Sequence, residues 1–413
     1  MSFKLKIVTL ACLSTLSAMA VADSSVTDSS VTASSVTVYG VIDLGILSET
    51  NASATAFGYL PNSHNTGSVV EMKDGGIGES YWGIKGSEDL GGGLKATFNL
   101  QGNIVANNGV GGGPNSYGTT SLFNQLANVG ISGGFGKIEL GRTVSPIYWA
   151  FASTDVCGGS YFGSSLTALV ALNSATGSFT GGDSNAVIGT VYNDNAFVYT
   201  TPTINGITAS FEYAMGGVAG NSSAMSQEAA TIMYNSGDGL KLDALIYNGN
   251  DDGRGVPAAP NGTNTNRLVQ VGAKYTWNAI STSAQYFKGT NPSNTGAGQN
   301  PPALGGAVTT GNVELYDLGL GYRVSEQTNI TSGYYHIKDV NHSDNISDMV
   351  SIGVNYSLSK LTTLYLEGAE VKNVGNNMNQ APVYATPVTA GTFSGTAAGI
   401  TSKAVMAGIR HSF

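Results

Sequence analysis

Residues 94–103 read LKATFNLQGN, and this stretch decides the fold. One parity of the stretch is apolar and the other is polar. Successive side chains of a β-strand point to opposite faces, so the alternation predicts a strand with one apolar and one polar face. The pattern returns at 269–277 and 350–358. The apolar set in the first stretch is Leu94, Ala96, Phe98 and Leu100.

The links between such segments are of two kinds. Tight links such as Gly91-Gly92-Gly93 alternate with long polar excursions. Short periplasmic turns and long external loops are typical of outer-membrane barrels, as are aromatic residues at strand ends such as Trp82 and Trp277. The long excursions cover residues 50–77, 107–121, 144–191, 249–265, 289–311 and 373–400.

Counting the alternating segments gives about sixteen strands, an even number that places both chain ends on one side of a membrane. Pairing of the first strand with the last would give both edge strands a hydrogen-bonding partner. The hydrocarbon core of a membrane requires this, because it offers no water to unpaired backbone groups. The sequence therefore predicts an all-β fold, a closed antiparallel transmembrane β-barrel wide enough to keep an aqueous lumen. The expected strands are 36–49, 78–90, 93–106, 122–133, 136–143, 194–202, 206–216, 226–236, 239–248, 266–277, 279–288, 312–324, 327–338, 347–358, 360–372 and 401–413.

The N-terminus predicts export. Lys4 and Lys6 precede an apolar run that ends in small residues around Ala20 and Ala22. This pattern is typical of a signal peptide, residues 1–22, followed by a short N-terminal extension, 23–35, and a barrel domain, 36–413. The apolar run is too short for a spanning helix.

The composition argues against several classes of protein. Charged residues make up only 11% of the chain, against a typical value of about 25%. The formal net charge is −9, and cleavage of the leader would remove two further lysines, so nucleic acid is not an expected partner. Cys12 lies in the leader, which leaves Cys157 without an intrachain partner.

The motifs of the first two hairpins and of both ends resemble the Gram-negative general porins of the neisserial and burkholderial type. They are VTVYGVID at 36–43, WGIKGSEDLGGGLKA at 82–96, VGISGGFG at 129–136 with LGR at 140–142, and AGIRHSF at 407–413. The resemblance spans essentially the whole mature chain. It implies a sixteen-stranded homotrimeric barrel in the outer membrane, whose third external loop, here 144–191, folds inward and narrows the lumen.

In that family, acids on the inward loop face basic residues on the wall. The candidate acids are Asp155 and Asp183, with Asp194 at the loop exit, although each could be a solvated loop acid. Lys85 faces the lumen by parity. Arg142 shares parity with Ile138 and Leu140, which leaves both the eyelet and the headgroup level open.

The chain departs from its relatives at the expected constriction. Many of them carry arginine where this chain has Tyr81, Gln125 and Tyr192, and those arginines are associated with anion preference. We therefore expect a diffusion pore for ions and small hydrophilic solutes with weak cation preference or little selectivity. A sugar-specific channel is the near alternative, since Tyr81, Tyr161 and Tyr192 could form an aromatic track.

Other classes of function are less well supported. Residues 130–134 match G-x-S-x-G, but a strand rather than a helix follows, so no hydrolase is predicted. No cofactor or metal site is predicted, because the four histidines lack ligand spacing. The alternatives from other classes are a non-conducting adhesin and an outer-membrane barrel enzyme.

The expected partners follow from the same reading. They are two further copies of the chain, outer-membrane lipid and lipopolysaccharide, permeating solutes, and the barrel-assembly machinery. The last would recognise the C-terminal strand, which ends with Ile409, His411 and Phe413 on one parity.

Overall fold

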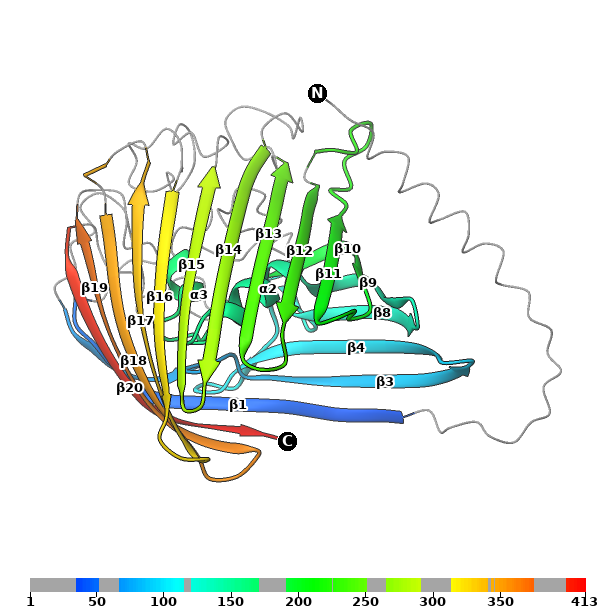
Figure 1. Ribbon diagram of the computed structural model, residues 1–413. Helices are drawn as coiled ribbons and strands as arrows, with labels where there is room; N and C mark the ends of the chain where they lie inside the picture. The colour runs from blue at the N-terminus through cyan, green and yellow to red at the C-terminus, as the bar shows by residue number, and fades with distance from the viewer. Residues whose placement is uncertain are drawn as a thin grey trace.

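The computed structural model describes residues 35–51, 67–114, 120–170, 191–224, 226–250, 265–290, 313–340, 343–344, 346–374 and 399–413. They form an antiparallel β-sheet closed into a barrel, with two short helices between β9 and β10 (Figure 1). The expected signal peptide and residues 23–34 of the extension lie outside the described residues.

The wall has 16 strand positions, as the sequence predicts. β2 and β3 share one position beside β1, while β5 to β7 are two-residue strands between β4 and β8. The elements are β1 (Ser35–Glu49), β2 (Val69–Asp74), β3 (Tyr81–Gly91), β4 (Leu94–Val105), β5 (Val110–Gly111), β6 (Gly113–Pro114), β7 (Thr120–Ser121), β8 (Leu126–Gly133), β9 (Gly136–Val144), α2 (Pro146–Thr154), α3 (Ser165–Val170), β10 (Tyr192–Thr200), β11 (Ile207–Ala214), β12 (Gln227–Asn235), β13 (Leu240–Asn250), β14 (Thr265–Trp277), β15 (Ile280–Thr290), β16 (Val313–Arg323), β17 (Thr328–Asp339), β18 (Ile346–Ser357), β19 (Thr362–Val374) and β20 (Thr401–Ser412).

Closure is made by β1, which has a neighbour on each side. It pairs with β20 from Val41 to Glu49, and with β3 and then β2 along its other edge. Backbone bonds between Gly40 and Phe413 continue the seam to the end of the chain, with N···O distances of 3.0 and 3.1 Å. The sheet therefore has no free edge at the β1–β20 seam, which a strand in hydrocarbon requires.

The two faces of the wall differ as the alternation predicts. On β16, Leu318 and Leu320 are 58% and 55% exposed, whereas Asp317, which has the opposite parity, is 1% exposed. The same split between exposed apolar and inward polar side chains recurs around the ring. The exposed apolar face is the surface that suits lipid. Among the described residues no helix is long and apolar enough to cross a membrane.

The expected strand 78–90 needs a correction. The chain follows β1 as two strands, β2 and β3, and leaves the wall at residues 75–80 between them. Residues 69–74, expected in a loop, are therefore strand. The inward detour turns at Gly75, whose φ of +78° favours glycine, and it passes close to Tyr365, since a Cβ at Gly76 would lie 2.5 Å from that ring.

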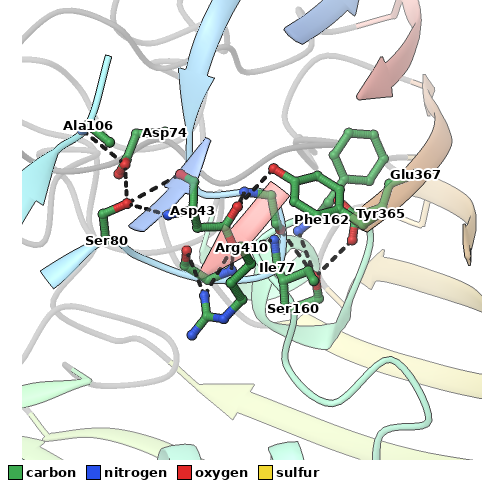
Figure 2. A network of polar contacts seen from close by, with 12 residues as sticks. Asp43, Asp74, Ile77, Ser80, Ala106, Ser160, Phe162, Tyr365, Glu367 and Arg410 are labelled. Carbon is green, nitrogen blue, oxygen red and sulfur yellow. Dashed lines mark hydrogen bonds and ion pairs between the residues drawn. The ribbon is translucent and has the colours of Figure 1, made fainter. Parts of the chain in front are cut away.

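The carboxylate of Asp43 holds this detour in place. Its side chain is fully buried and accepts backbone N–H bonds from Gly76, Ile77 and Gly78 at 3.2, 3.1 and 3.0 Å. Tyr365 of β19 donates to it at 2.8 Å, and the Arg410 guanidinium of β20 lies 3.0 Å away (Figure 2). One carboxylate thus joins β1, the detour, β19 and β20 across the seam.

We expect Asp43→Asn to lower the free energy of unfolding by about 3 kcal/mol, because breaking a buried ion pair by changing one partner costs several kcal/mol. Urea titration of the detergent-folded protein, followed by loss of heat-modifiable migration on a gel, measures this. The matched control is Asp89→Asn, an exposed acid near the end of β3. An unchanged urea midpoint for Asp43→Asn would contradict the role given to this carboxylate.

Candidate pore constriction

The segment between β9 and β10, described over residues 145–170, packs against the polar face of the wall. Ser145 begins it, accepting from the Ile147 N–H as the N-cap of α2 and donating to Glu212 of β11. In Figure 1, α2 and α3 lie behind the wall strands β12 to β15. Residues 145–168 thus contact the face of the wall that lies opposite the exposed apolar face.

Polar contacts join α2 and the turn after it to three consecutive strands. Thr154 donates to Asp243 of β13 at 2.8 Å, and the Val156 N–H donates to Ser283 of β15 at 3.1 Å. Lys274 of β14 donates to the Asp155 carbonyl at 3.0 Å. Further along, Ser351 of β18 donates to the Gly163 carbonyl.

Apolar packing adds to these contacts. The buried residues of α2 and α3 form one cluster with inward apolar side chains of β12 to β19. Phe151 meets Phe287 of β15 with ring centroids 6.4 Å apart. The cluster comprises Ile147, Ala150, Phe151, Tyr161, Leu166, Ala168, Ala229, Leu245, Tyr247, Leu268, Phe287, Leu315, Tyr335, Ile337, Met349 and Val371.

Asp155 has a structural place in this segment. It is fully buried, and its carboxylate accepts from the Cys157 N–H at 2.7 Å and from both the backbone and the hydroxyl of Ser165 at 3.0 and 2.9 Å. Tyr335 of β17 donates to it at 3.3 Å. The carboxylate therefore anchors the turn between α2 and α3 and is not exposed to open solvent, where an eyelet acid would lie.

The three predicted residues Arg142, Tyr192 and Asp194 do come together. Arg142 Nη1 lies 2.9 Å from Asp194, its Nε donates to the Asn124 carbonyl at 2.6 Å, and its guanidinium carbon lies 5.7 Å from the Tyr192 ring centre. Glu79 joins the group, because Tyr192 and Gln125 both donate to its carboxylate.

A β-bulge decides the orientation that parity left open for Arg142. Leu140 is 46% exposed on the outward face, and strict alternation would put Arg142 there as well. Gly141 has a φ of +120°, where a Cβ would lie 2.3 Å from the Ala127 carbonyl, and the pairing with β10 shifts register between Asn193 and Ala196. The irregularity turns Arg142 inward, where it is 9% exposed.

Tyr81 and Lys85 form a second group around Tyr39 of β1. The Tyr39 and Tyr81 rings meet edge to face at 6.1 Å, and the Lys85 ammonium lies 4.7 Å from the Tyr39 ring centre. The Tyr39 hydroxyl donates toward Asn99 and Gln101 of β4. Lys85 is exposed on this inner face, in line with its parity.

The remaining predicted residues divide by position. Asp183 lies outside the described residues. Ile409 faces outward at 45% exposure, His411 bonds Thr362 at 2.9 Å, and Phe413 lies against Gly40 at the seam.

Burial raises the pKa of the Cys157 thiol to about 12, so this side chain stays protonated at neutral pH.

Sequence reasoning missed Glu79 and Asp43. Glu79 has the same parity as the lumen residues Tyr81 and Lys85, so extending that parity two residues back could have found it. Asp43 ends the motif at 36–43, but its role could not be predicted, because its donors come from the detour at 76–78 and from strands more than 300 residues away.

Comparison with known proteins assigns the family. The model for Gram-negative porins matches residues 9–376, and the chain belongs to this family. Outer membrane porin protein 32 of Delftia acidovorans is 28% identical over 387 residues, covering 90% of this chain and 99% of that protein. An outer membrane porin protein of Bordetella pertussis is 26% identical over 352 residues, covering 78% of this chain and 83% of that protein. The protein is therefore an outer-membrane porin, a channel rather than an enzyme.

Solved structures share the fold. An anion-selective porin from Comamonas acidovorans aligns with a TM-score of 0.69 at 22% identity, covering 92% of this chain and all of that one. OmpF of Salmonella typhi, solved with daunomycin, aligns with a TM-score of 0.56 at 15% identity over 92% of this chain. Porins of this kind commonly form trimers, and a solved trimer form of Vibrio cholerae OmpT has a TM-score of 0.59.

Proposed function

We propose that the chain forms a general diffusion channel in which residues 145–170 narrow the lumen and the preference is weakly for cations. We infer the preference for cations over anions from one observation. Among the described residues, nine acids are buried against two bases, Lys73 and Arg142. The acids are Asp43, Glu49, Asp74, Glu79, Asp155, Glu212, Asp243, Asp317 and Glu367. Asp43 is paired with Arg410, and Asp155 is closed off by Ser165 and Tyr335, so the other seven acids carry the proposed preference. Rings of acidic side chains favour cation passage.

One relative has the opposite ion preference. The porin from Comamonas acidovorans is anion-selective by its title. In this chain Tyr81, Gln125 and Tyr192 occupy positions at which the family often has arginine, and Tyr192 and Gln125 both donate to Glu79. At these positions the inner wall therefore holds uncharged side chains, two of which bond to the acid Glu79, and not the cationic side chains that would attract anions.

A sugar-specific channel is less well supported. Tyr161 is one of the three tyrosines of the expected aromatic track. It is only 8% exposed and packs in the apolar cluster between the loop and the wall. The described residues thus present a broken track rather than a continuous one.

The test is the reversal potential across a planar bilayer that separates unequal KCl solutions. We expect a modest potential with the sign of cation permeation. Arg142→Gln should increase it, because Asp194 then loses the cation that pairs with it. The control Lys372→Gln should leave it unchanged, since Lys372 is exposed on the outward face of β19. Strong anion preference of the unmodified protein would refute the proposal.

We also propose partners for the outer surface. The outward faces of β1 to β9 carry apolar residues and, among the described positions, no lysine or arginine, which suits contact with two further copies of the chain. The C-terminal strand with Ile409, His411 and Phe413 would be the part recognised by the barrel-assembly machinery.

Lipopolysaccharide would be held on the part of the ring from β14 to β20, which adjoins this face at the β1–β20 seam. Five outward-facing cations gather at the loop-side ends of β14 to β20, which we call the rim belt: Arg267, Lys288, Lys338, Lys372 and Lys403. Lys288 and Lys338 flank Glu314 at 4.0 and 3.5 Å, and Lys403 lies 3.1 Å from Glu370. Each cation near an anionic lipid surface contributes about 1 kcal/mol.

Binding of purified lipopolysaccharide to the detergent-folded barrel tests the rim belt. The triple variant Lys288→Gln, Lys338→Gln, Lys372→Gln should bind at least tenfold more weakly, since roughly 3 kcal/mol is removed. A triple change of inward lysines, Lys85→Gln, Lys95→Gln, Lys137→Gln, is the matched control. Equal affinities of the two triple variants would show that the belt is not the contact.

A further inference from the structure

A cavity lies behind the inward segment, on the turn-side half of the wall. It has a volume of about 110 Å³ and is partly open. The inward segment lines it with residues between Val156 and Gly163, the detour at 75–80 contributes Ile77, and β17 to β19 contribute polar groups that include Thr331, Asn355 and Glu367. Arg142, Tyr192 and Asp194 lie outside this lining, whereas Ile77 is also one of the N–H donors to Asp43.

The cavity exists because of a glycine. Gly353 pairs with Glu367 on one side and with Thr331 on the other. A Cβ built at Gly353 would lie 3.2 Å from the Thr331 hydroxyl and 3.8 Å from the Glu367 Cγ. Any larger side chain would occupy the space between these two polar groups.

Glu367 presents an unpaired carboxylate oxygen to this cavity. Its side chain is 6% exposed, and Oε1 receives one long bond of 3.5 Å from Ser160 (Figure 2). Oε2 has no hydrogen-bond partner among the described residues. A buried carboxylate without a partner is costly, so the site is incomplete without a donor.

A second unpaired acceptor lines the same cavity. Asn355 Oδ1 is buried and has no partner in the part of the chain that the structure describes. Asn355 is two residues from Gly353 on the same face of β18, which makes it a diagonal neighbour of Glu367. Diagonal neighbours lie about 7–8 Å apart with their Cβ atoms somewhat closer, a gap that one small group with several N–H donors can bridge.

The chemistry of the lining favours one class of ligand. Divalent metals need several carboxylate ligands, and the described residues contain no group of three or more His, Cys, Asp or Glu side chains placed to hold one. A primary ammonium carries three N–H donors, which match Glu367 Oε2, Asn355 Oδ1 and a hydroxyl. Ile77, Val156 and Phe162 offer an apolar side for a short alkyl chain.

We propose that this cavity is a binding subsite for small primary alkylammonium ions, a site beside the permeation path and separate from the constriction. The proposal rests on the lumen being open to small cations, as the proposed function holds. Occupancy would place one extra positive charge behind residues 156–163 and so reduce passage of other cations.

The experiment measures the K⁺ current through single channels as ethylammonium chloride is added. We expect the current to fall to a plateau at saturation, with a half-blocking concentration at least tenfold higher in Glu367→Gln. Glu370→Gln, on the outward face of the same strand, should match the unmodified protein. Tetraethylammonium, which has no N–H donor, should show no block that depends on Glu367.

A second variant tests the space of the cavity separately from the charge of Glu367. Gly353→Val keeps Glu367 but fills the space beside it, and it should weaken the block as much as Glu367→Gln does. Saturation-transfer NMR of ethylammonium on the detergent-folded barrel gives the same comparison without any current. Equal ethylammonium binding by the unmodified protein, Glu367→Gln and Gly353→Val would overturn the subsite, whereas a folded barrel that binds ethylammonium but passes no current would refute only the proposed channel function.

Discussion

Closure of the barrel at the β1–β20 seam is the constraint on which the other features depend. Backbone bonds join the two ends of the chain from Val41 to Phe413, and the Asp43 carboxylate ties β1 to β19, β20 and the detour at 75–80. A sheet with an open edge could not hold an apolar outer face in lipid. Only the closed ring separates that face from a polar interior.

The polar interior in turn explains the shape of the segment between β9 and β10. Wall side chains such as Asp243, Ser283 and Ser351 bond to its hydroxyl and backbone groups, while an apolar cluster fills the space between the helices and the wall. Because these contacts spread from β11 to β19, the segment is held at many points. Buried acids exceed buried bases around it, which gives the lumen its proposed preference.

The sequence allowed most strands and the closed fold to be predicted, because a period of two is visible in segments such as 94–103, 269–277 and 350–358. It did not reveal the break between β2 and β3 or the bulge at Gly141, since both depend on contacts with distant strands. Arg142, Tyr192 and Asp194 were found by position and family resemblance, and they do meet. Asp155 was a candidate for the same reason, but burial by α3 and Tyr335 cannot be read from a loop sequence.

We expect the polar inner face to enclose a continuous aqueous path past residues 145–170. Swelling of proteoliposomes in isotonic solutions of a pentose, a hexose, a disaccharide and a tetrasaccharide measures it most directly. Uptake rates that fall steadily with solute size and do not saturate are the predicted result. Proteoliposomes that hold correctly folded, heat-modifiable barrel and swell in none of these sugars would contradict it.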